Sequence, residues 1–287
     1  MVSLLMQDHS TALISLALAE DIGPGDVTSR YFIPEERRAV AFIAVRKDGV
    51  VSGVELAARV FLAVDPSLCV EILVTDASRV SAGALLIRIE GLARSILTAE
   101  RTALNFLQHL SGIATLTAEY VQQIQGTNAR ILDTRKTTPG YRLLEKKAVL
   151  DGGGTNHRLG LYDRAMVKDN HLAAESDIAT IRAAISHMKS QQPEVETELE
   201  ADHLDQVKTF LQLDEVDYIL LDNMSLEELR EAVEMRGSNS KPQLEASGGI
   251  TLETVREIAL TGIDFVSVGA LTHSAPALDI GLDFEVL

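Results

Sequence analysis

The strongest constraint on the fold of this chain is an alternation of short apolar strands with longer periodic segments over residues 113–270. Such alternation predicts parallel strands joined by crossover helices. The span is shorter than the roughly 250 residues of a full eight-unit barrel, so we expect an open, incomplete (β/α) barrel. The predicted strands are ARILDT, RAMVKD, VETELE, DYILLD, QLEAS and DFVSVG, and the predicted helices are Ile178–Lys189, His203–Leu213, Leu226–Met235 and Leu252–Leu260.

Residues 1–112 have a different, mixed pattern, and we expect them to form a separate N-terminal α/β sandwich domain. The segment RAVAFIAVRKDGVVSGV predicts two strands joined by an Asp-Gly turn. A helical pattern runs from Leu92 to about Gln123 and is predicted to break or kink near Gly112. The C-terminal residues 271–287 are expected to return to this domain as a strand. The predicted fold class is therefore α/β in both parts.

Charge and composition restrict the partners of the chain. With 26 Lys and Arg residues against 42 Asp and Glu residues, the formal net charge is −16. An acidic body disfavours nucleic acid, whose backbone needs a basic surface, but a local basic cluster still attracts small anions. No apolar stretch approaches the roughly 18 residues of a membrane span, and the N-terminus lacks signal-peptide features. We therefore expect no membrane partner and a cytoplasmic location. Cys69 is the single cysteine, which excludes an internal disulfide.

One run of cationic residues, between Asp133 and His171, surrounds three consecutive glycines. Arg135 and Lys136 follow one predicted strand and Lys168 ends another, and in (β/α) barrels the chemistry lies at these carboxyl ends. Guanidinium groups pair with carboxylates or phosphates, so several converging cations predict a ligand with more than one anionic group. For part of the run, a solvated helix face is the alternative interpretation. The other members are Arg142, Lys146, Lys147, His157, Arg158, Arg164 and His171.

Acidic residues end two further predicted strands. Glu196, Glu198 and Glu200 alternate along one strand and therefore point to one face, and Asp222 ends the next strand. Buried carboxylates need cations. These residues therefore form a structural ion-pair network, bind Mg²⁺ together with substrate phosphates, or stabilise a positive charge that develops on a sugar carbon.

Glycines in three places allow backbone N–H groups to approach an anion. Two of the places end the last predicted strands and match the phosphate site of barrels. The third is the triplet before His157 and Arg158. Turn geometry alone is the alternative interpretation. The residues of the predicted phosphate site are Ser247, Gly248, Gly249, Gly269 and Ala270, and the triplet is Gly152, Gly153 and Gly154.

A phosphate site, further cations and carboxylates suited to a divalent ion together favour a phosphoribosyl donor as substrate. At this point the sequence also resembles the quinolinate phosphoribosyltransferase family. The motifs that carry the resemblance cover nearly the whole chain in order. They are EDIGPGDVTS, AERTALNFLQHLSGIAT, DTRKTTPGYR, GGGTNHRLGL, VKDNH, ETELE, LLDN, EASGGI and VSVGALTHS.

The resemblance implies an N-terminal α/β sandwich plus an open barrel, assembled as a homodimer or larger homo-oligomer. It implies phosphoribosyl pyrophosphate and quinolinate as substrates, Mg²⁺ as cofactor, and nicotinate mononucleotide, pyrophosphate and CO₂ as products. It also gives roles to individual residues. Arg135, His157, Arg158 and Lys168 would hold the quinolinate carboxylates, and Lys136 would meet the pyrophosphate.

The remaining roles implied by the resemblance concern the donor and the neighbouring subunit. Glu198 and Asp222 would lie by the ribose and Mg²⁺, so that Lys136, Lys168, Glu198 and Asp222 form the catalytic set. Arg101 would reach into the neighbour's site, although its spacing alone predicts a surface charge. His273, in the last motif, is a further candidate for substrate binding.

Four alternatives remain at this stage. A related pyrophosphorylase of molybdate-uptake loci and nicotinate phosphoribosyltransferase share part of the pattern, but TRKTTPG, NHR and KDNH favour the quinolinate enzyme. A Schiff-base aldolase would use Lys168 as nucleophile, and the many arginines argue against it. A non-catalytic anion-binding barrel would bind ligand without releasing pyrophosphate.

Overall fold

The computed structural model describes residues 2–168 and 178–285, and the chain divides into two compact units. The first consists of residues 1–118, 137–153 and 271–287, and the second of residues 119–136 and 154–270. The division expected at residue 112 assigned 113–118 and 137–153 to the barrel, whereas here both segments pack in the first unit. The reason for the second segment is helix α5 (Arg142–Asp151), whose Lys147 Nζ lies 2.7 Å from the Asp76 carboxylate.

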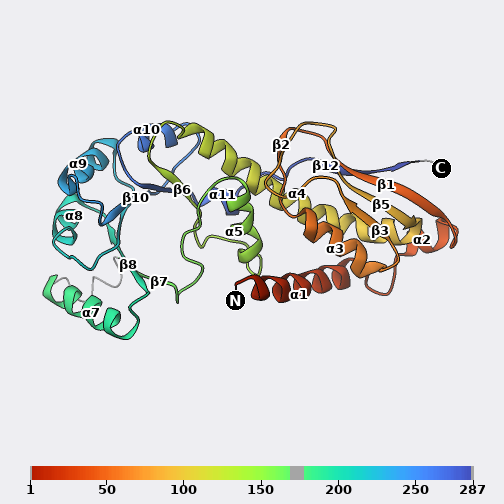
Figure 1. Cartoon of the computed structure of the whole chain (residues 1–287), viewed down its shortest axis with the longest axis horizontal. Helices are drawn as coiled ribbons and strands as arrows, with labels where there is room; N and C mark the ends of the chain where they lie inside the picture. Colours follow the sequence, from red (N-terminus) through yellow and green to blue (C-terminus); the bar gives the residue numbers. More distant parts are fainter. Residues whose placement is uncertain (1, 169–177, 286–287) are drawn as a thin grey trace. The chain divides into compact units, whose positions relative to one another are not determined.

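The first unit is built on a four-stranded sheet in the order β12-β1-β5-β3 (Figure 1). The expected hairpin is wrong, because β1 pairs antiparallel with β5 and β12, and β2 pairs with β4. Strand β1 is buried on both faces along most of its length, so it takes a central position with a partner on each side. The strands are β1 (Arg38–Val45), β2 (Gly49–Val50), β3 (Cys69–Ile72), β4 (Arg79–Val80), β5 (Leu85–Leu92) and β12 (Ile280–Glu285).

Helices α1 (Val2–Ile22), α2 (Val27–Phe32) and α3 (Val54–Val64) also belong to the first unit. Helix α3 buries Val54, Ala57, Val60 and Phe61 completely and contacts β3 and β5. These residues recur at helical spacing, so one face of α3 covers the sheet. The C-terminal strand was expected to return to this part of the chain, and its pairing with β1 over Val40–Val45 confirms that expectation.

The long helix α4 (Ala93–Gln123) is continuous, so the predicted break at Gly112 is wrong. The glycine has a packing role instead. A Cβ atom at Gly112 would lie 2.2 Å from the backbone oxygen of Pro276, so only glycine allows the C-terminal segment to approach the helix this closely. The sequence showed the glycine but not the chain that passes beside it.

The second unit contains a six-stranded parallel sheet in the order β6-β11-β10-β9-β8-β7. Strands β6 and β7 are its two edges, so the barrel is open between them, and the expected α/β open barrel is confirmed. All six predicted strands are present. They are β6 (Arg130–Leu132), β7 (Arg164–Val167), β8 (Glu196–Ala201), β9 (Tyr218–Asp222), β10 (Gln243–Ser247) and β11 (Phe265–Ser267).

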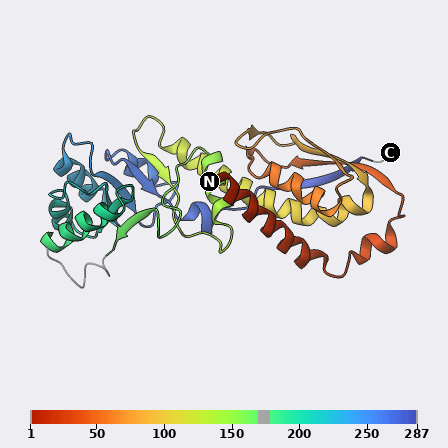
Figure 2. The ribbon, with the colours of Figure 1, turned by 60° about the horizontal axis from the view of Figure 1, so that its bottom comes forward.

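Helices α7 (Ile178–Gln191), α8 (Leu204–Phe210) and α9 (Leu226–Arg236) lie together on one side of these strands in both views (Figures 1 and 2). Helix α10 (Val255–Ala259) and the short α11 (Ala270–His273) follow the last strands. Helices α8 and α10 are shorter than predicted. Helix α8 begins only at Leu204 because the Gln206 side chain accepts the N–H of His203, which is the cap residue.

The strand register stacks the inward-facing residues of the barrel in layers. Asp222 of β9 pairs with Ser247 of β10 at the carboxyl ends. One layer below, Leu220 is flanked by Glu200 and Glu245. Because side chains on one face recur every second residue, this register alone brings polar groups from separate strands to one edge of the sheet.

Candidate active site

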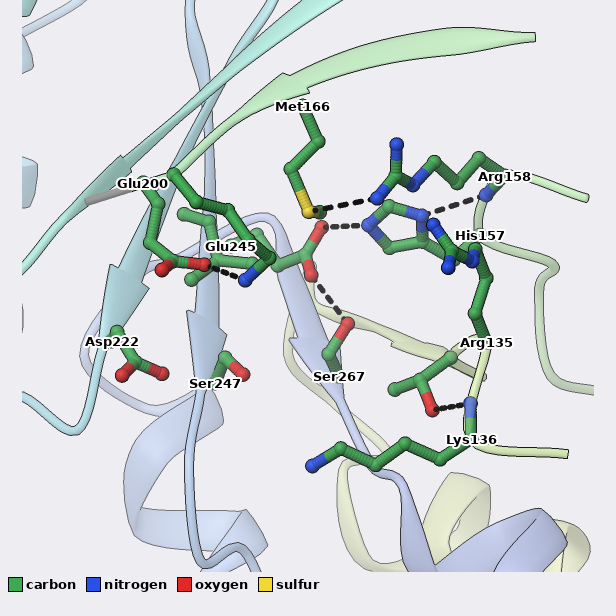
Figure 3. Close-up of a pocket in the computed structure, with 13 residues that line it drawn as sticks. Arg135, Lys136, His157, Arg158, Met166, Glu200, Asp222, Glu245, Ser247 and Ser267 are labelled. Carbon is green, nitrogen blue, oxygen red and sulfur yellow. Dashed lines mark hydrogen bonds and ion pairs between the residues drawn. The ribbon is translucent and has the colours of Figure 1, made fainter. Parts of the chain in front are cut away.

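A pocket of about 290 Å³ opens at the carboxyl ends of the six parallel strands. Cationic residues lie along one side of it, and Glu200, Asp222 and Ser247 lie along the other (Figure 3). The strand ends therefore converge as the sequence predicted. The residues that line the pocket are Thr134, Arg135, Lys136, His157, Arg158, Met166, Lys168, Glu200, Leu220, Asp222, Glu245, Ser247 and Ser267.

Four predicted cations line this pocket: Arg135, Lys136, Arg158 and Lys168. The Arg158 guanidinium donates to the Arg164 carbonyl at 3.2 Å and contacts the Met166 sulfur at 3.5 Å. Partial burial and the nearby Arg135 charge lower the pKa of Arg158 from its usual value. Two guanidinium groups that repel each other in a partly buried site favour an anionic ligand between them.

Two carboxylates line the opposite side of the pocket. Glu200 forms an ion pair with Lys168. Asp222 accepts a hydrogen bond of 2.8 Å from the side-chain amide of Asn223, whose backbone has a φ of +53°. Glu200 was part of the acidic pattern in the sequence but was not chosen as a site residue. The structure brings it, and not Glu198, into the pocket.

Glu198 lies one layer deeper than Glu200 because it precedes it by two residues on the same face of β8. Its side chain has no exposed surface, and it does not line the pocket. Arg164 Nη1 lies 3.5 Å from its carboxylate, and His157 Nε2 lies 3.3 Å from it. A carboxylate enclosed by two protein partners does not fit the predicted contact with ribose or Mg²⁺.

At the floor of the pocket, Glu245 of β10 is also completely buried, and Ser267 of β11 donates a hydrogen bond to it. Burial and the neighbouring Glu198 charge raise the pKa of Glu245. The pKa of Glu198 is lowered although its burial acts in the opposite direction, because His157 and Arg164 stabilise its charge. The two buried glutamates thus have environments that separate their pKa values, an arrangement typical of functional sites.

His157 is 6% exposed and joins these two glutamates to the loop before β7. Its Nε2 lies within 3.4 Å of both Glu198 and Glu245, and its Nδ1 accepts the backbone N–H of Arg158 at 2.6 Å. Asp133 holds the preceding peptide of the same loop, because it accepts the N–H of His157 at 2.9 Å. Burial lowers the pKa of His157, but the two carboxylates raise it to about 9.

The glycines that end β10 have the backbone geometry expected for a phosphate loop. Gly248 has a φ of +102° and Gly249 a φ of +60°, conformations that favour glycine. A Cβ atom on Gly248 would lie 2.1 Å from the Asn223 side chain. Ser247 lines the pocket, and Gly269 with Ala270 follows β11, so the predicted phosphate residues lie at neighbouring strand ends.

Other residues predicted from the sequence lie elsewhere. Arg101 is exposed on α4 and His273 is exposed on α11, both in the first unit. His171 lies outside the described residues. Gly152 packs against α4, where a Cβ would lie 2.4 Å from the Ala114 oxygen. The first glycine of the triplet, Gly152, therefore has a packing role. The part of the basic run on α5, namely Arg142, Lys146 and Lys147, also belongs to the first unit.

Sequence reasoning missed Met166, Glu245 and Ser267 as site residues. Each precedes by two positions a predicted site residue at the end of its strand or just beyond it: Lys168, Ser247 and Gly269 respectively. The alternation of side chains along a strand would have found them.

The residues present fit a Mg²⁺ ion held mainly by substrate. Asp222 lines the pocket and has oxygen ligands available to a hard cation. Such an ion takes one or two protein carboxylates, with substrate phosphates and water completing its coordination.

Comparisons with known proteins agree with this geometry. The model of the quinolinate phosphoribosyl transferase C-terminal domain matches residues 113–283, and that of the N-terminal domain matches residues 26–111. The chain is 43% identical over 290 residues to a chloroplastic nicotinate-nucleotide pyrophosphorylase [carboxylating] of Arabidopsis thaliana, covering 96% of this chain and 82% of the relative. It is 42% identical to the enzyme of that name from Mycobacterium leprae, covering 96% and 97%.

Solved structures give the same result. The nicotinate-nucleotide pyrophosphorylase of Francisella tularensis superposes with a TM-score of 0.89 at 38% identity, covering 97% of this chain and 96% of the other. That of Ehrlichia chaffeensis has a TM-score of 0.88 at 38% identity, covering 96% and 98%. Human nicotinic acid phosphoribosyltransferase, at 13% identity and a TM-score of 0.59, shares the fold alone. The resemblance inferred from the motifs is confirmed, and this chain belongs to the quinolinate phosphoribosyltransferase family.

Proposed function

We propose that this enzyme transfers the phosphoribosyl group of phosphoribosyl pyrophosphate to quinolinate and removes one carboxylate, forming nicotinate mononucleotide, pyrophosphate and CO₂. This reaction belongs to the de novo synthesis of NAD. The observation that carries the proposal is the pocket itself. Arg135, Lys136 and Arg158 lie across the pocket from Glu200 and Asp222 at the carboxyl ends of an open barrel, and Lys168 pairs with Glu200. Relatives of about 40% identity carry the name of this activity.

The cations divide into two groups by position. Arg135 and Arg158 come from the two segments that border the opening between β6 and β7, and with Lys168 they are suited to hold the two carboxylates of quinolinate. Their planar guanidinium groups fit carboxylates bidentately. Lys136 Nζ points toward the side of Asp222 and Ser247 in Figure 3, where it is suited to meet the pyrophosphate.

The donor is assigned to the opposite side of the pocket. The Ser247–Gly249 turn, with Gly269 and Ala270, would bind the 5′-phosphate through backbone N–H groups. Glu200 and Asp222 would bind the ribose hydroxyls. Asp222 would also hold Mg²⁺ together with phosphate oxygens, and this ion supplies charge neutralisation of the pyrophosphate when bound.

The chemistry requires positioning and electrostatic stabilisation more than covalent catalysis. The bond between C1 of the ribose and pyrophosphate breaks as positive charge develops on the sugar, which Glu200 and Asp222 stabilise. The pyridine nitrogen forms the new bond to C1. The quaternised ring then accepts the electron pair of the adjacent C–CO₂ bond, CO₂ leaves, and the ring carbon takes a proton. Lys168, already paired with Glu200, links the two substrate positions.

The test is pyrophosphate release from phosphoribosyl pyrophosphate and Mg²⁺, measured with quinolinate and with nicotinate in parallel. Release with quinolinate, accompanied by one CO₂ per pyrophosphate, is the expected result. Release with nicotinate alone would identify the non-decarboxylating relative, and no release with either would leave an anion-binding barrel. Omission of Mg²⁺ or addition of a chelator is expected to abolish turnover.

The assembly is part of the same proposal. We assign Arg101, exposed on α4, to the site of a second copy in a homodimer or larger homo-oligomer, and His273 to substrate binding. A cytoplasmic location is proposed with it, and fractionation of cells that express the tagged chain would test it. Among the described residues, no helix has the length and apolar character needed to cross a bilayer.

A further inference from the structure

A buried network at the floor of the pocket joins three strands to the loop that carries Arg158, and Figure 3 shows its members Ser267, Glu245 and His157. Ser267 of β11 bonds to Glu245 of β10, and Glu245 and Glu198 of β8 both face Nε2 of His157. The other ring nitrogen of His157 accepts the backbone N–H of Arg158. The network therefore runs from the barrel floor to a residue assigned to quinolinate.

If both glutamates are ionised, this network has one proton too few to give each of the two carboxylates a hydrogen-bond donor where they face His157. Two carboxylates face a single ring N–H, at distances of 3.3 and 3.4 Å. Glu245 Oε1 accepts from Ser267, but its buried Oε2 has no hydrogen-bond partner among the described residues. An unsatisfied acceptor beside a second carboxylate is unfavourable in a buried site.

The additional proton has two possible positions, Nδ1 of His157 and Oε2 of Glu245. Electrostatics alone favours the ring, since the two carboxylates raise the pKa of His157 to about 9. Hydrogen-bond geometry opposes it, because a proton on Nδ1 would face the Arg158 N–H across 2.6 Å. Within the described residues Oε2 makes no hydrogen bond and has only the long 3.4 Å contact with Nε2 of His157, and burial beside Glu198 raises the pKa of Glu245. A proton on Glu245 also removes one of the two negative charges that favour a protonated His157 ring. The hydrogen-bond geometry therefore decides in favour of a proton on Glu245.

We propose that Glu245 is a neutral carboxylic acid and a positioning residue for the substrate pocket. Its proton is directed to Glu198, whose carboxylate lies within 4.8 Å and keeps its charge through Arg164. Glu198 then accepts the Nε2–H of a neutral His157, whose Nδ1 fixes the backbone of Arg158. The proposal deepens the proposed function, since it rests on Arg158 as a ligand of quinolinate.

This arrangement changes the role expected for His157. Both ring nitrogens have protein partners. His157 therefore lines the pocket without binding quinolinate through its ring, and it holds the Arg158 backbone in place. A metal ion between His157, Glu198 and Glu245 is the competing interpretation, because their ligand atoms lie within 4.8 Å of one another. A metal-bound histidine donates its other ring N–H, whereas here that nitrogen accepts, and Arg164 already occupies Glu198.

The first test makes the same chemical change at both glutamates. Glu245→Gln keeps an acceptor for Ser267 and a donor for Glu198, so we expect a quinolinate KM within about threefold of wild type. Glu198→Gln removes the acceptor of His157 and Arg164 and is expected to raise that KM about tenfold or more. Glu245→Met, which lacks both hydrogen bonds, is expected to do the same. The KM for phosphoribosyl pyrophosphate changes less in all three. Equal damage from the two glutamine variants would overturn the proposal.

The second test needs no substrate. ¹⁵N NMR of histidine-labelled protein at pH 7, with His157 assigned through His157→Gln, reads the protonation of the ring directly. A neutral ring protonated on Nε2, in wild type and in Glu245→Gln, supports the proposal. An imidazolium in wild type, or a Zn²⁺-dependent shift of this resonance, would overturn it. If Glu198→Gln does not fold, the two Glu245 variants and the spectrum still decide. Absence of quinolinate turnover in wild type would refute the proposed function while leaving the spectrum informative.

Discussion

Single residues two positions apart on one strand have different roles in this protein. Glu200 reaches the pocket and pairs with Lys168, whereas Glu198 lies one layer deeper, bound by His157 and Arg164. Both point to the same side of β8. The residue scale therefore decides which charge is available to a substrate and which one supports the pocket from below.

At this scale, Arg135→Ala is expected to raise the KM for quinolinate by about 10- to 100-fold. A charge-assisted hydrogen bond contributes about 1.5–3 kcal/mol, and each 1.4 kcal/mol corresponds to about tenfold in affinity. Steady-state kinetics with each substrate varied in turn measures this effect, and the KM for phosphoribosyl pyrophosphate should change less.

The matched control for this substitution is Arg230→Ala. Arg230 lies on α9 with its side chain 51% exposed, and its nearest carboxylate is 3.8 Å away. We expect wild-type kinetics from it. A normal quinolinate KM in Arg135→Ala would contradict the role assigned to Arg135.

At the scale of elements, the position of the pocket follows from where each element ends. The six strands are parallel, so their carboxyl ends share one edge, and the opening between β6 and β7 admits the loop that carries His157 and Arg158. Thr155 of this loop forms a parallel bridge with Leu132 of β6. The loop therefore continues the sheet for one residue before it turns into the pocket.

Helix α4 gives the first prediction at this scale. Alanine is favoured over glycine in a helix by about 1 kcal/mol, yet Gly112→Ala is expected to destabilise the protein. Its Cβ would lie 2.2 Å from the backbone oxygen of Pro276, and backbone yields less readily than a side chain. The melting temperature should fall by several degrees. The control is Glu119→Ala, an exposed change on the same helix, which should leave it nearly unchanged.

Asp217 gives the second prediction at this scale, because its carboxylate bonds to α7, to β8 and to the segment before β10. Its carboxylate accepts from Lys189 of α7 at 2.8 Å, from Lys241 at 2.7 Å and from the N–H of Thr197 in β8 at 3.0 Å. Burial raises the pKa of Asp217, but these partners outweigh it and lower the pKa below the usual 3.8. A lowered folded-state pKa adds stability above the unfolded-state value, and this stability is lost as the pH falls through the folded-state pKa.

Asp217→Asn is therefore expected to cost about 1–3 kcal/mol at neutral pH. Chemical unfolding of both proteins from pH 7 down to pH 3 measures the difference. It should be constant at neutral pH and shrink once the pH falls below about 4, close to the usual carboxyl pKa. A difference that grows on acidification would contradict the assigned sign.

At the scale of the whole molecule, one copy of the chain does not form a complete active site if its Arg101 serves the site of a neighbouring copy. At quinolinate concentrations well below the KM of either variant, two variants of low activity should then restore each other. Arg101→Ala keeps its own pocket, Arg135→Ala keeps its Arg101, and each mixed dimer contains one intact site. Random exchange of equal amounts should recover about a quarter of wild-type activity in a two-fold assembly. No recovery, with mixed dimers demonstrated by two affinity tags, would place Arg101 outside the site.

Much of the fold and the substrate pocket could be predicted from the sequence, and for local reasons. Alternating apolar runs predicted all six barrel strands, and their polar ends predicted Arg135, Lys136, Lys168, Asp222 and Ser247 as pocket residues. Strand periodicity and the parallel arrangement determine these positions, because they require only short-range sequence patterns. The motifs identified the family, and the comparisons confirmed it.

Tertiary structure decided what depends on contacts between distant segments. It placed Glu200 and not Glu198 in the pocket, paired β1 with β12 instead of β2, and gave Gly112 a packing role against Pro276. It also put Glu245 under His157, although the two residues are 88 positions apart in the chain. Charge burial and strand register are properties of the packed molecule. The sequence by itself determined which chemical groups this protein has at its strand ends, and packing determined which of them face the substrates.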